Sequence, residues 1–419
     1  MTTRRLFLKR SGIAFFGLGA APGMLVRAAA AADGAKRRRT LVVVLQRGAA
    51  DALNIVVPHA ERAYYDARRT IAVAEPRRSG AESVLDLDSH FGFHPALEPL
   101  LPLYQDGRLA VVHAVGSPDP TRSHFDAQDF LESGTPGRKA TEDGWLNRHL
   151  QAEGTAAASP LRAVALTPTL PRTLQGRAPA VAMANVRDFR LHAGGETAVA
   201  RGFEDMYAGV VQDALHSAGR EAFDAMEALR AADLSGGAGG GSGPREARGL
   251  PGLAEGLLQV ARLVKADVGV EVAFLETSGW DHHAAEGGAL GQLSGRLRDF
   301  GASLAAFYRE LGPRGDDVVT VTLTEFGRTV RENGNRGTDH GHGSVAFVLG
   351  GGVRGGRVHG RWPGLRPSDL YEGRDLAVTT DFRDLLGELL ARHLGASDLG
   401  SVFPGHACDP ARFPGTMRA

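Results

Sequence analysis

Cysteine is almost absent from this sequence: Cys408 is the single one among 419 residues. One cysteine excludes an internal disulfide, and it also excludes a structural zinc site built from several cysteines. The stability of the folded chain must therefore come from its apolar core, with a bound metal as the remaining candidate contribution.

Lysine is also scarce, with four residues, so arginine supplies almost all of the positive charge. The formal net charge is zero, and no basic stretch beyond the first forty residues is interleaved with aromatic side chains. Nucleic acid is therefore not an expected partner. The Gly-Gly-Gly run at 350–352 follows a predicted strand, but no fitting helix follows it, which disfavours a dinucleotide-dependent oxidoreductase.

The first 32 residues predict a twin-arginine signal peptide. Arg4 and Arg5 precede Phe-Leu-Lys, an apolar run extends from Gly12 to about Val26, and small residues at 30–32 offer cleavage sites. An N-terminal membrane anchor is the alternative, but the apolar run is short and interrupted by glycine and proline. We expect a periplasmic or secreted protein that uses the twin-arginine export machinery and keeps no stable membrane span after cleavage.

Strand-length apolar runs alternate with helical patterns along the rest of the chain. Strands are expected within 39–51, 109–115, 162–168, 268–283, 316–329 and 345–353, and helices within 94–105, 122–134, 290–311 and 380–395. This alternation predicts an α/β fold whose mostly parallel central sheet carries helices on both faces. A single domain over 33–419 is expected, with the glycine-rich segment at 235–243 as a surface loop, because the alternation resumes after it.

Metal-ligand side chains follow several of the predicted strands. In open parallel sheets, ligands bind beyond the carboxyl ends of the strands, so these side chains are expected at one edge. They are Asp51, Ser123, His124, Asp281, His282, His283, Glu325, and then Asp339, His340 and His342 in the segment GTDHGHG at 337–343. Carboxylate with imidazole suits zinc, manganese or iron, and suits calcium or magnesium less well. One or two divalent ions are expected, zinc foremost.

Several of these residues also have an explanation without a metal. Asp51 could cap a turn, Glu325 could pair with Arg328, and Ser123 is a helix N-cap, with Asp126 three residues later. An N-cap hydroxyl also lies beside free backbone N–H groups, where an anion can bind. The joint pattern favours a metal site, because independent loops would not be expected to share one sheet edge.

Several segments together resemble domain-of-unknown-function family 1501, which is placed among alkaline-phosphatase and sulfatase-like folds. Besides the leader, they are LQRGAADALN, RSHFDAQDF, TSGWDHH, TEFGRTVRENGNRGTDHGHG and TTDFRDLLGELL. The resemblance implies an alkaline-phosphatase-like fold with two metals. One would take Asp51, Ser123, Asp339 and His340, and the other Asp281, His283 and His342. His124 and Glu325 would support the ligands or face the substrate, although His124 could replace Ser123 as a ligand.

The implied activity is that of an exported, metal-dependent hydrolase of phosphate or sulfate esters. Its nucleophile would be the Ser123 hydroxyl or a metal-activated water. The alternative is a non-catalytic binding or assembly protein that keeps the fold and a structural metal.

Gly341 is expected to let the backbone turn between His340 and His342. The segment CDPAR at 408–412 matches the Cys-x-Pro-x-Arg pattern of sulfatases, but its place after the last helix argues against that modification.

Overall fold

The structure is a computed structural model that describes residues 38–76, 82–139, 141–154, 159–186, 224–225, 227–229, 232 and 252–418. All of them except Arg38 belong to one compact unit, Arg39–Ala419. The predicted signal peptide at 1–32 and the predicted loop at 235–243 lie outside the described residues, so both stay predictions. Across the described ranges, no helix combines the length and the apolarity that crossing a membrane requires.

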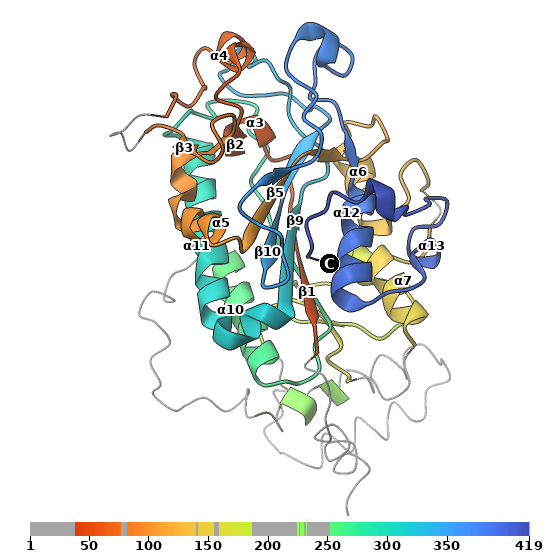
Figure 1. Cartoon of the computed structure of the whole chain (residues 1–419). Coiled ribbons are helices and arrows are strands. Elements are labelled where there is room, and N and C mark those ends of the chain that lie inside the picture. The colour runs from red at the N-terminus through yellow and green to blue at the C-terminus, as the bar shows by residue number, and fades with distance from the viewer. Residues whose placement is uncertain are drawn as a thin grey trace, which may run out of the picture. The chain divides into compact units, whose positions relative to one another are not determined.

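A central sheet runs through this unit (Figure 1). Within the described part of the chain it has nine strands, in the order β11-β5-β10-β9-β1-β8-β6-β7, with β12 paired to β5. Every pairing is parallel except those of β10, which runs antiparallel to both β5 and β9. The strands are β1 (Thr40–Gln46), β5 (Leu109–Gly116), β6 (Ala163–Ala165), β7 (Val181–Ala182), β8 (Val272–Thr277), β9 (Val318–Leu323), β10 (Ser344–Gly350), β11 (Val358–His359) and β12 (Thr380–Asp381).

Helices cover both faces of this sheet (Figure 1). One face carries η1 (Pro95–Leu100), α5 (Leu101–Gln105), α10 (Gly252–Lys265) and α11 (Gln292–Leu311). The other carries α6 (His124–Ser133), α7 (Trp145–Ala152), α12 (Phe382–Leu389), a π-helical turn (Leu390–Leu394) and α13 (Leu399–Val402). Alternate residues of β1 belong to the apolar cores on the two faces of the sheet. Val42 packs with α10 and α11, and Val43 packs with α7 and α12. The predicted α/β class, with a mostly parallel sheet between helices, is confirmed.

Smaller elements complete the described part. A second sheet, in the order β2-β4-β3, joins Val56–Val57, Gly92–Phe93 and Leu85–Asp86. Short helices are α3 (Ala52–Ile55) and α4 (Arg62–Ala67), and the remaining 3₁₀ turns are η2 (Arg172–Leu174), η4 (Gly312–Asp317), η5 (Pro367–Asp369) and η7 (Pro410–Arg412).

The predicted elements differ from the observed ones mainly at their ends. The helix expected at 122–134 is α6, which begins after Ser123, as expected, and ends at Gly134 in a left-handed conformation with φ of 68°. The helix expected before Asp106 is divided into η1 and α5. Pro99 and Pro102 explain the division, because proline removes a backbone donor. The strand expected at 162–168 is shorter, Ala163–Ala165.

The direction of β10 determines where the chain places its polar loops. Strands β1, β5, β8 and β9 all run the same way, so their carboxyl ends meet at one edge. Because β10 runs the opposite way, the connection 324–343 both leaves β9 and enters β10 at that edge. This connection begins beside Glu325 and ends with the GTDHGHG segment. The antiparallel strand therefore brings both ends of a long segment to one place.

Candidate metal centre

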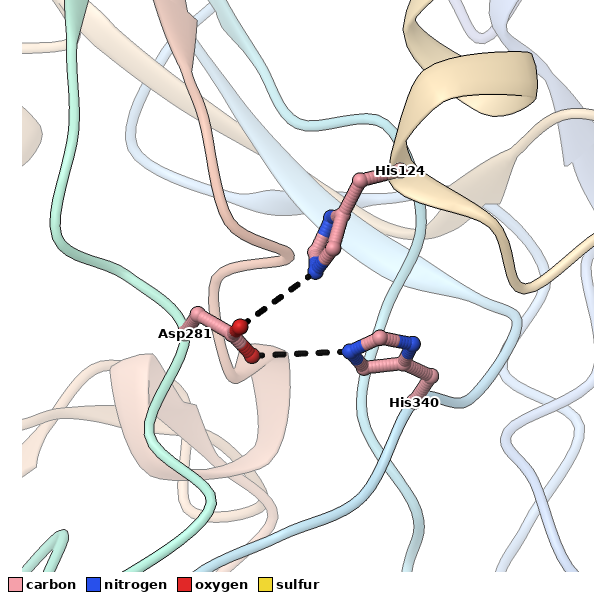
Figure 2. A group of neighbouring side chains, drawn as sticks. All are labelled: His124, Asp281 and His340. Carbon is pink, nitrogen blue, oxygen red and sulfur yellow. Dashed lines mark ion pairs between the residues drawn. The ribbon is translucent and has the colours of Figure 1, made fainter.

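Three imidazole rings meet around the carboxylate of Asp281, in the loop after β8. Oδ1 of Asp281 lies 3.0 Å from Nε2 of His283 and 3.5 Å from Nε2 of His340. Oδ2 lies 3.5 Å from Nε2 of His124, at the start of α6. Figure 2 shows His124 and His340 pointing toward Asp281 from two different segments. Three segments at one sheet edge thus supply four potential ligands.

Each ring uses its other nitrogen to contact an oxygen. The distances from Nδ1 are 2.7 Å (His124 to Oε1 of Glu325), 3.2 Å (His283 to Oδ1 of Asp339) and 2.8 Å (His340 to the carbonyl oxygen of Arg122). An oxygen acceptor requires the proton on Nδ1, so Nε2 of each neutral ring carries a lone pair. Histidines that bind metals have this arrangement, with the second nitrogen donating to a carboxylate or a carbonyl.

Potential ligand atoms of His124, Asp281 and His340 all lie within 4.8 Å of one another, and His283 adjoins this group through its contacts with Asp281 and His340. Nε2 of His283 lies 3.0 Å from Nε2 of His340, and Nε2 of His124 is buried without a hydrogen-bond partner in the described structure. Lone pairs and a carboxylate gathered in this way repel one another unless a proton or a cation lies between them. Three imidazoles with one carboxylate suit zinc, manganese or iron. The residues present therefore fit a divalent cation.

Glu325 fixes the orientation of the His124 ring by accepting a hydrogen bond from it. Its side chain is buried, and Oε1 accepts hydrogen bonds from Nδ1 of His124 (2.7 Å), the Gly48 N–H (2.9 Å) and the Gln128 amide (2.9 Å). Burial raises the pKa of Glu325, but these hydrogen bonds outweigh it and hold the pKa below its ordinary value. The hydrogen bond to Glu325 in turn raises the pKa of His124.

Arg328 connects the loops that carry the site. Its buried guanidinium donates to the carbonyl oxygens of Gly48 (2.6 Å), Ala49 (2.7 Å) and Thr338 (3.1 Å), and it also pairs with Asp281. Burial raises the pKa of Asp281, but the hydrogen bond and the charge of Arg328, together with the nearby histidines, outweigh burial and lower it. Arg328 thus pairs with Asp281, while Glu325 pairs with His124. The alternative that Glu325 only pairs with Arg328 is therefore wrong.

Comparison with known families identifies the chain. The family model described as "Protein of unknown function (DUF1501)" matches residues 38–404. The chain belongs to this DUF1501 family. No curated protein matches it. One similar solved structure is the C-terminal periplasmic domain of EcEptC from Escherichia coli, in complex with Zn. It has 10% sequence identity and a TM-score of 0.35, over 76% of this chain and 74% of that one.

Asp339, which the DUF1501 resemblance implies as a metal ligand, lies beside the observed group of rings. Asp339 is exposed over half of its side chain and contacts His283 rather than Asp281. Asn333, which the sequence did not single out, donates to Oδ1 of Asp339 (3.0 Å) and to the carbonyl oxygen of His283 (2.9 Å). The hydrogen bond from Asn333 lowers the pKa of Asp339, and His283 lowers it further. In this position the Asp339 carboxylate fixes the orientation of the His283 ring through its contact with Nδ1.

Asp51 lies apart from the three rings. Both of its oxygens contact the guanidinium of Arg68, with Oδ1 2.8 Å from Nη2, and both side chains are buried. Arg68 also donates to the carbonyl oxygens of Thr329 and Val330, each at 2.9 Å. Burial raises the pKa of Asp51, and Arg68 outweighs burial and lowers it. In this arrangement Asp51 anchors the connection that carries Asp339 and does not reach Asp281.

Glu286 lies against the same buried pair and was also missed. Burial and the Asp51 carboxylate raise the pKa of Glu286 well above its ordinary value. Its Oε2 accepts a hydrogen bond of 2.9 Å from the Thr338 hydroxyl. Glu286 lies only five residues after Asp281 in the sequence, but its contact with Asp51 depends on tertiary packing, which the sequence does not show.

His342 and His282 also lie outside the cluster. The ring of His342 is buried and stacks on Tyr371, with centroids 4.4 Å apart, and within the described structure it pairs with no other candidate ligand. His282 is buried as well, so of these two adjacent histidines it is His283 that faces Asp281.

Gly341 has no left-handed conformation. It is required for a different reason, because a Cβ there would lie 2.4 Å from the backbone of Arg328.

Ser123 is exposed at the N-cap of α6. Its Oγ accepts a hydrogen bond of 3.5 Å from the Asp126 N–H, so the predicted capping role is confirmed. The structure thus gathers His124, Asp281, His283 and His340, with Glu325 and Asp339 supporting two of the rings. It does not gather Asp51 and His342 with them.

Proposed function

We propose that this DUF1501 chain is an exported, metal-dependent hydrolase of phosphate or sulfate esters. The observation that carries the proposal is the convergence of three Nε2 atoms on the Asp281 carboxylate. A divalent cation held by His124, Asp281, His283 and His340 would neutralise charge on a phosphoryl or sulfuryl oxygen and activate an oxygen nucleophile. The twin-arginine leader expected at 1–32 supports export.

Several side chains of the proposed site are partly exposed, as binding of a substrate from solvent requires. Asp281, His283 and Asp339 are 43%, 45% and 53% exposed, whereas the Glu325 side chain is 0% exposed. The proposed ligands Asp281 and His283 are therefore accessible from solvent, while the hydrogen bond that orients His124 is protected from water. A buried hydrogen bond of this kind keeps the ring preorganised, because water cannot compete for its partners.

Ser123 is the candidate nucleophile contributed by the chain itself. It directly precedes His124, and its hydroxyl lies at the N-terminus of the ten-residue helix α6. The partial positive charge of a helix N-terminus favours an anionic ester group there. In this role Oγ of Ser123 would bond to the phosphorus or sulfur atom while the bond from that atom to the alcohol oxygen breaks. The hydroxyl proton would pass to solvent, the departing alcohol would take up a proton from solvent, and water would then hydrolyse the seryl ester.

The test is turnover of aryl phosphate and aryl sulfate esters by the purified protein loaded with zinc, manganese, iron, calcium or magnesium in turn. We expect turnover with at least one metal and its loss in His340→Ala. Ser123→Asn removes the hydroxyl but retains N-capping, which makes it a better probe than Ser123→Ala. Loss of turnover in Ser123→Asn assigns the nucleophile to Ser123, and retention assigns it to water.

One observation favours the second candidate, a non-catalytic exported protein with a structural metal. In the described structure, the hydrogen bond that Oγ of Ser123 makes is to the Asp126 N–H, and no base contacts it. A cation would then hold together the segments that follow β5 and β8 and precede β10. Full metal loading without turnover of either ester class, with a large loss of thermal stability on chelation, would favour this candidate.

A further inference from the structure

A second group of metal-ligand side chains lies outside the site around Asp281. Asp384 comes from the first turn of α12, and His406 and Cys408 come from the segment between α13 and η7. Their potential ligand atoms all lie within 4.8 Å of one another. We propose that Asp384, His406 and Cys408 form a second metal site, for one borderline-to-soft divalent cation, with zinc as the best match.

The donor set determines which cation would bind. A thiolate, an imidazole and a carboxylate together suit zinc, and the sulfur disfavours calcium and magnesium, which take oxygen ligands. Three protein ligands leave one tetrahedral position for water or another small ligand. This set differs from the site around Asp281, which contains no sulfur, so the two sites can be distinguished by spectroscopy.

The group is built into the fold and is not an accident of a mobile surface. The side chains of Asp384 and His406 are 6% and 8% exposed, and Nε2 of His406 lies 2.7 Å from Oδ1 of Asp384. Gly387, one turn after Asp384, makes room for the thiol. A Cβ at position 387 would lie only 3.2 Å from Sγ of Cys408. A larger residue there would push the sulfur away from Asp384.

A pocket of about 460 Å³ adjoins the group and would give access to the open coordination position. His406 and Cys408 contribute to its lining, as do the carboxylates of Asp398 and Asp409. Among the described residues that line it, none is lysine or arginine. These carboxylates favour a cation over an anion, and a bound cation would take the place of Arg412, whose Nε lies 4.0 Å from Oδ2 of Asp384.

Binding would require two local changes. Burial raises the pKa of Cys408 to about 11, so the thiol is protonated in the ion-free protein, and its proton would pass to solvent as the sulfur binds. Two ligand atoms on one tetrahedral zinc lie about 3.3 Å apart, so the contact between His406 and Asp384 would open slightly. Deprotonation also ends the hydrogen bond from the Cys408 thiol to the Arg383 carbonyl oxygen, which lies 3.8 Å from Sγ.

The experiment is a titration of the full-length protein with Co²⁺, a spectroscopic substitute for zinc. Cys408 is the sole cysteine, so a thiolate-to-cobalt charge-transfer band in the near ultraviolet can arise only from this site. We expect that band to saturate at one equivalent per chain and to be absent in Cys408→Ser. The visible cobalt bands of the site around Asp281 should persist in that variant. His406→Gln should weaken the near-ultraviolet response at least tenfold.

Absence of a thiolate band in folded wild-type protein at saturating Co²⁺ would overturn the proposal. Equal zinc content in folded wild type and Cys408→Ser would also overturn it. Cys408→Ala provides a second variant if serine disturbs the packing against Gly387. If neither variant folds, the wild-type spectrum still decides the question. The outcome does not depend on ester hydrolysis, because no step of the titration measures turnover.

Discussion

Nε2 of His283 lies 3.0 Å from Nε2 of His340, while the Nδ1 atom of each ring is directed at an oxygen. Two neutral imidazoles cannot share a hydrogen bond when both protons are on the far nitrogens. A proton on one ring or a cation between the rings would remove this conflict, and the cation of the proposed site would take Asp281 as its charged ligand. The predictions below follow from this relationship and from the buried groups that hold it in place.

Replacing Asp281 by asparagine should remove the ion from this site. The substitution keeps the shape of the side chain but removes the negative charge that binds the cation and pairs with Arg328. Metal analysis of purified protein should show about one equivalent less than wild type. Asp316→Asn is the matched control, because Asp316 is a 70% exposed carboxylate paired with Arg108. Equal loss in both variants would contradict the assignment.

Glu325→Gln should weaken metal binding without abolishing it. The glutamine can still accept from the Gly48 N–H, but it no longer offers a charged acceptor to Nδ1 of His124. Loss of such a supporting contact typically lowers metal affinity about 10–100-fold. Competition with a metal-binding dye measures the change. Glu310→Gln, at the pair with Lys265, should leave affinity unchanged. An unchanged affinity in Glu325→Gln would show that His124 is not a ligand.

Asp51→Asn should destabilise the fold and leave metal stoichiometry intact. Breaking a buried ion pair costs about 3–5 kcal/mol, and Arg68 would be left buried with a weaker partner. Denaturant unfolding of the metal-loaded protein measures this cost. Asp66→Asn, at an exposed pair with Arg62, should cost under about 1 kcal/mol. Loss of one metal equivalent in folded Asp51→Asn would instead support the ligand role that the sequence predicts.

His393 should make the fold less stable in acid. Nε2 of His393 donates to the carbonyl oxygen of Thr40 at 2.9 Å, and burial lowers the pKa of the ring to about 4. An unfolded histidine binds its proton near pH 6.5, so between these values the unfolded state holds more protons. The free energy of unfolding should therefore fall as pH drops from about 6.5 to about 4, by up to about 3 kcal/mol from this residue.

His393→Gln tests that contribution, because glutamine can donate to Thr40 and does not titrate. Denaturant unfolding measured at several pH values should give a shallower decline for the variant than for wild type over that interval. A parallel decline in the two proteins would contradict the prediction. His393 lies in the π-helical turn after α12, away from the proposed ligands.

The sequence predicted the sheet edge better than it predicted the site. Continuous apolar strands and the Ser123 cap are local signals, and they located β1, β5, β9 and α6. The rule that ligands gather at strand ends then brought His124, Asp281, His283 and Glu325 to one edge, with His340. It could not say which way each side chain points.

The residues that the sequence misjudged are those whose role depends on tertiary packing. Asp51 turns toward Arg68, and His342 stacks on Tyr371, although both lie in segments that approach the site. Arg328 gained its role by reaching the loops after β1 and β8, which are distant from it in sequence. The direction of β10 was also not predicted, because an apolar run carries no signal for parallel or antiparallel pairing.

The most direct test of the metal centre is an anomalous-difference map, recorded at the zinc absorption edge from crystals of zinc-loaded protein. The account predicts a peak bounded by Nε2 of His124, His283 and His340 and by the Asp281 carboxylate. It is contradicted if zinc-loaded crystals show no peak among these four side chains, or if the peak lies instead between Asp51 and His342.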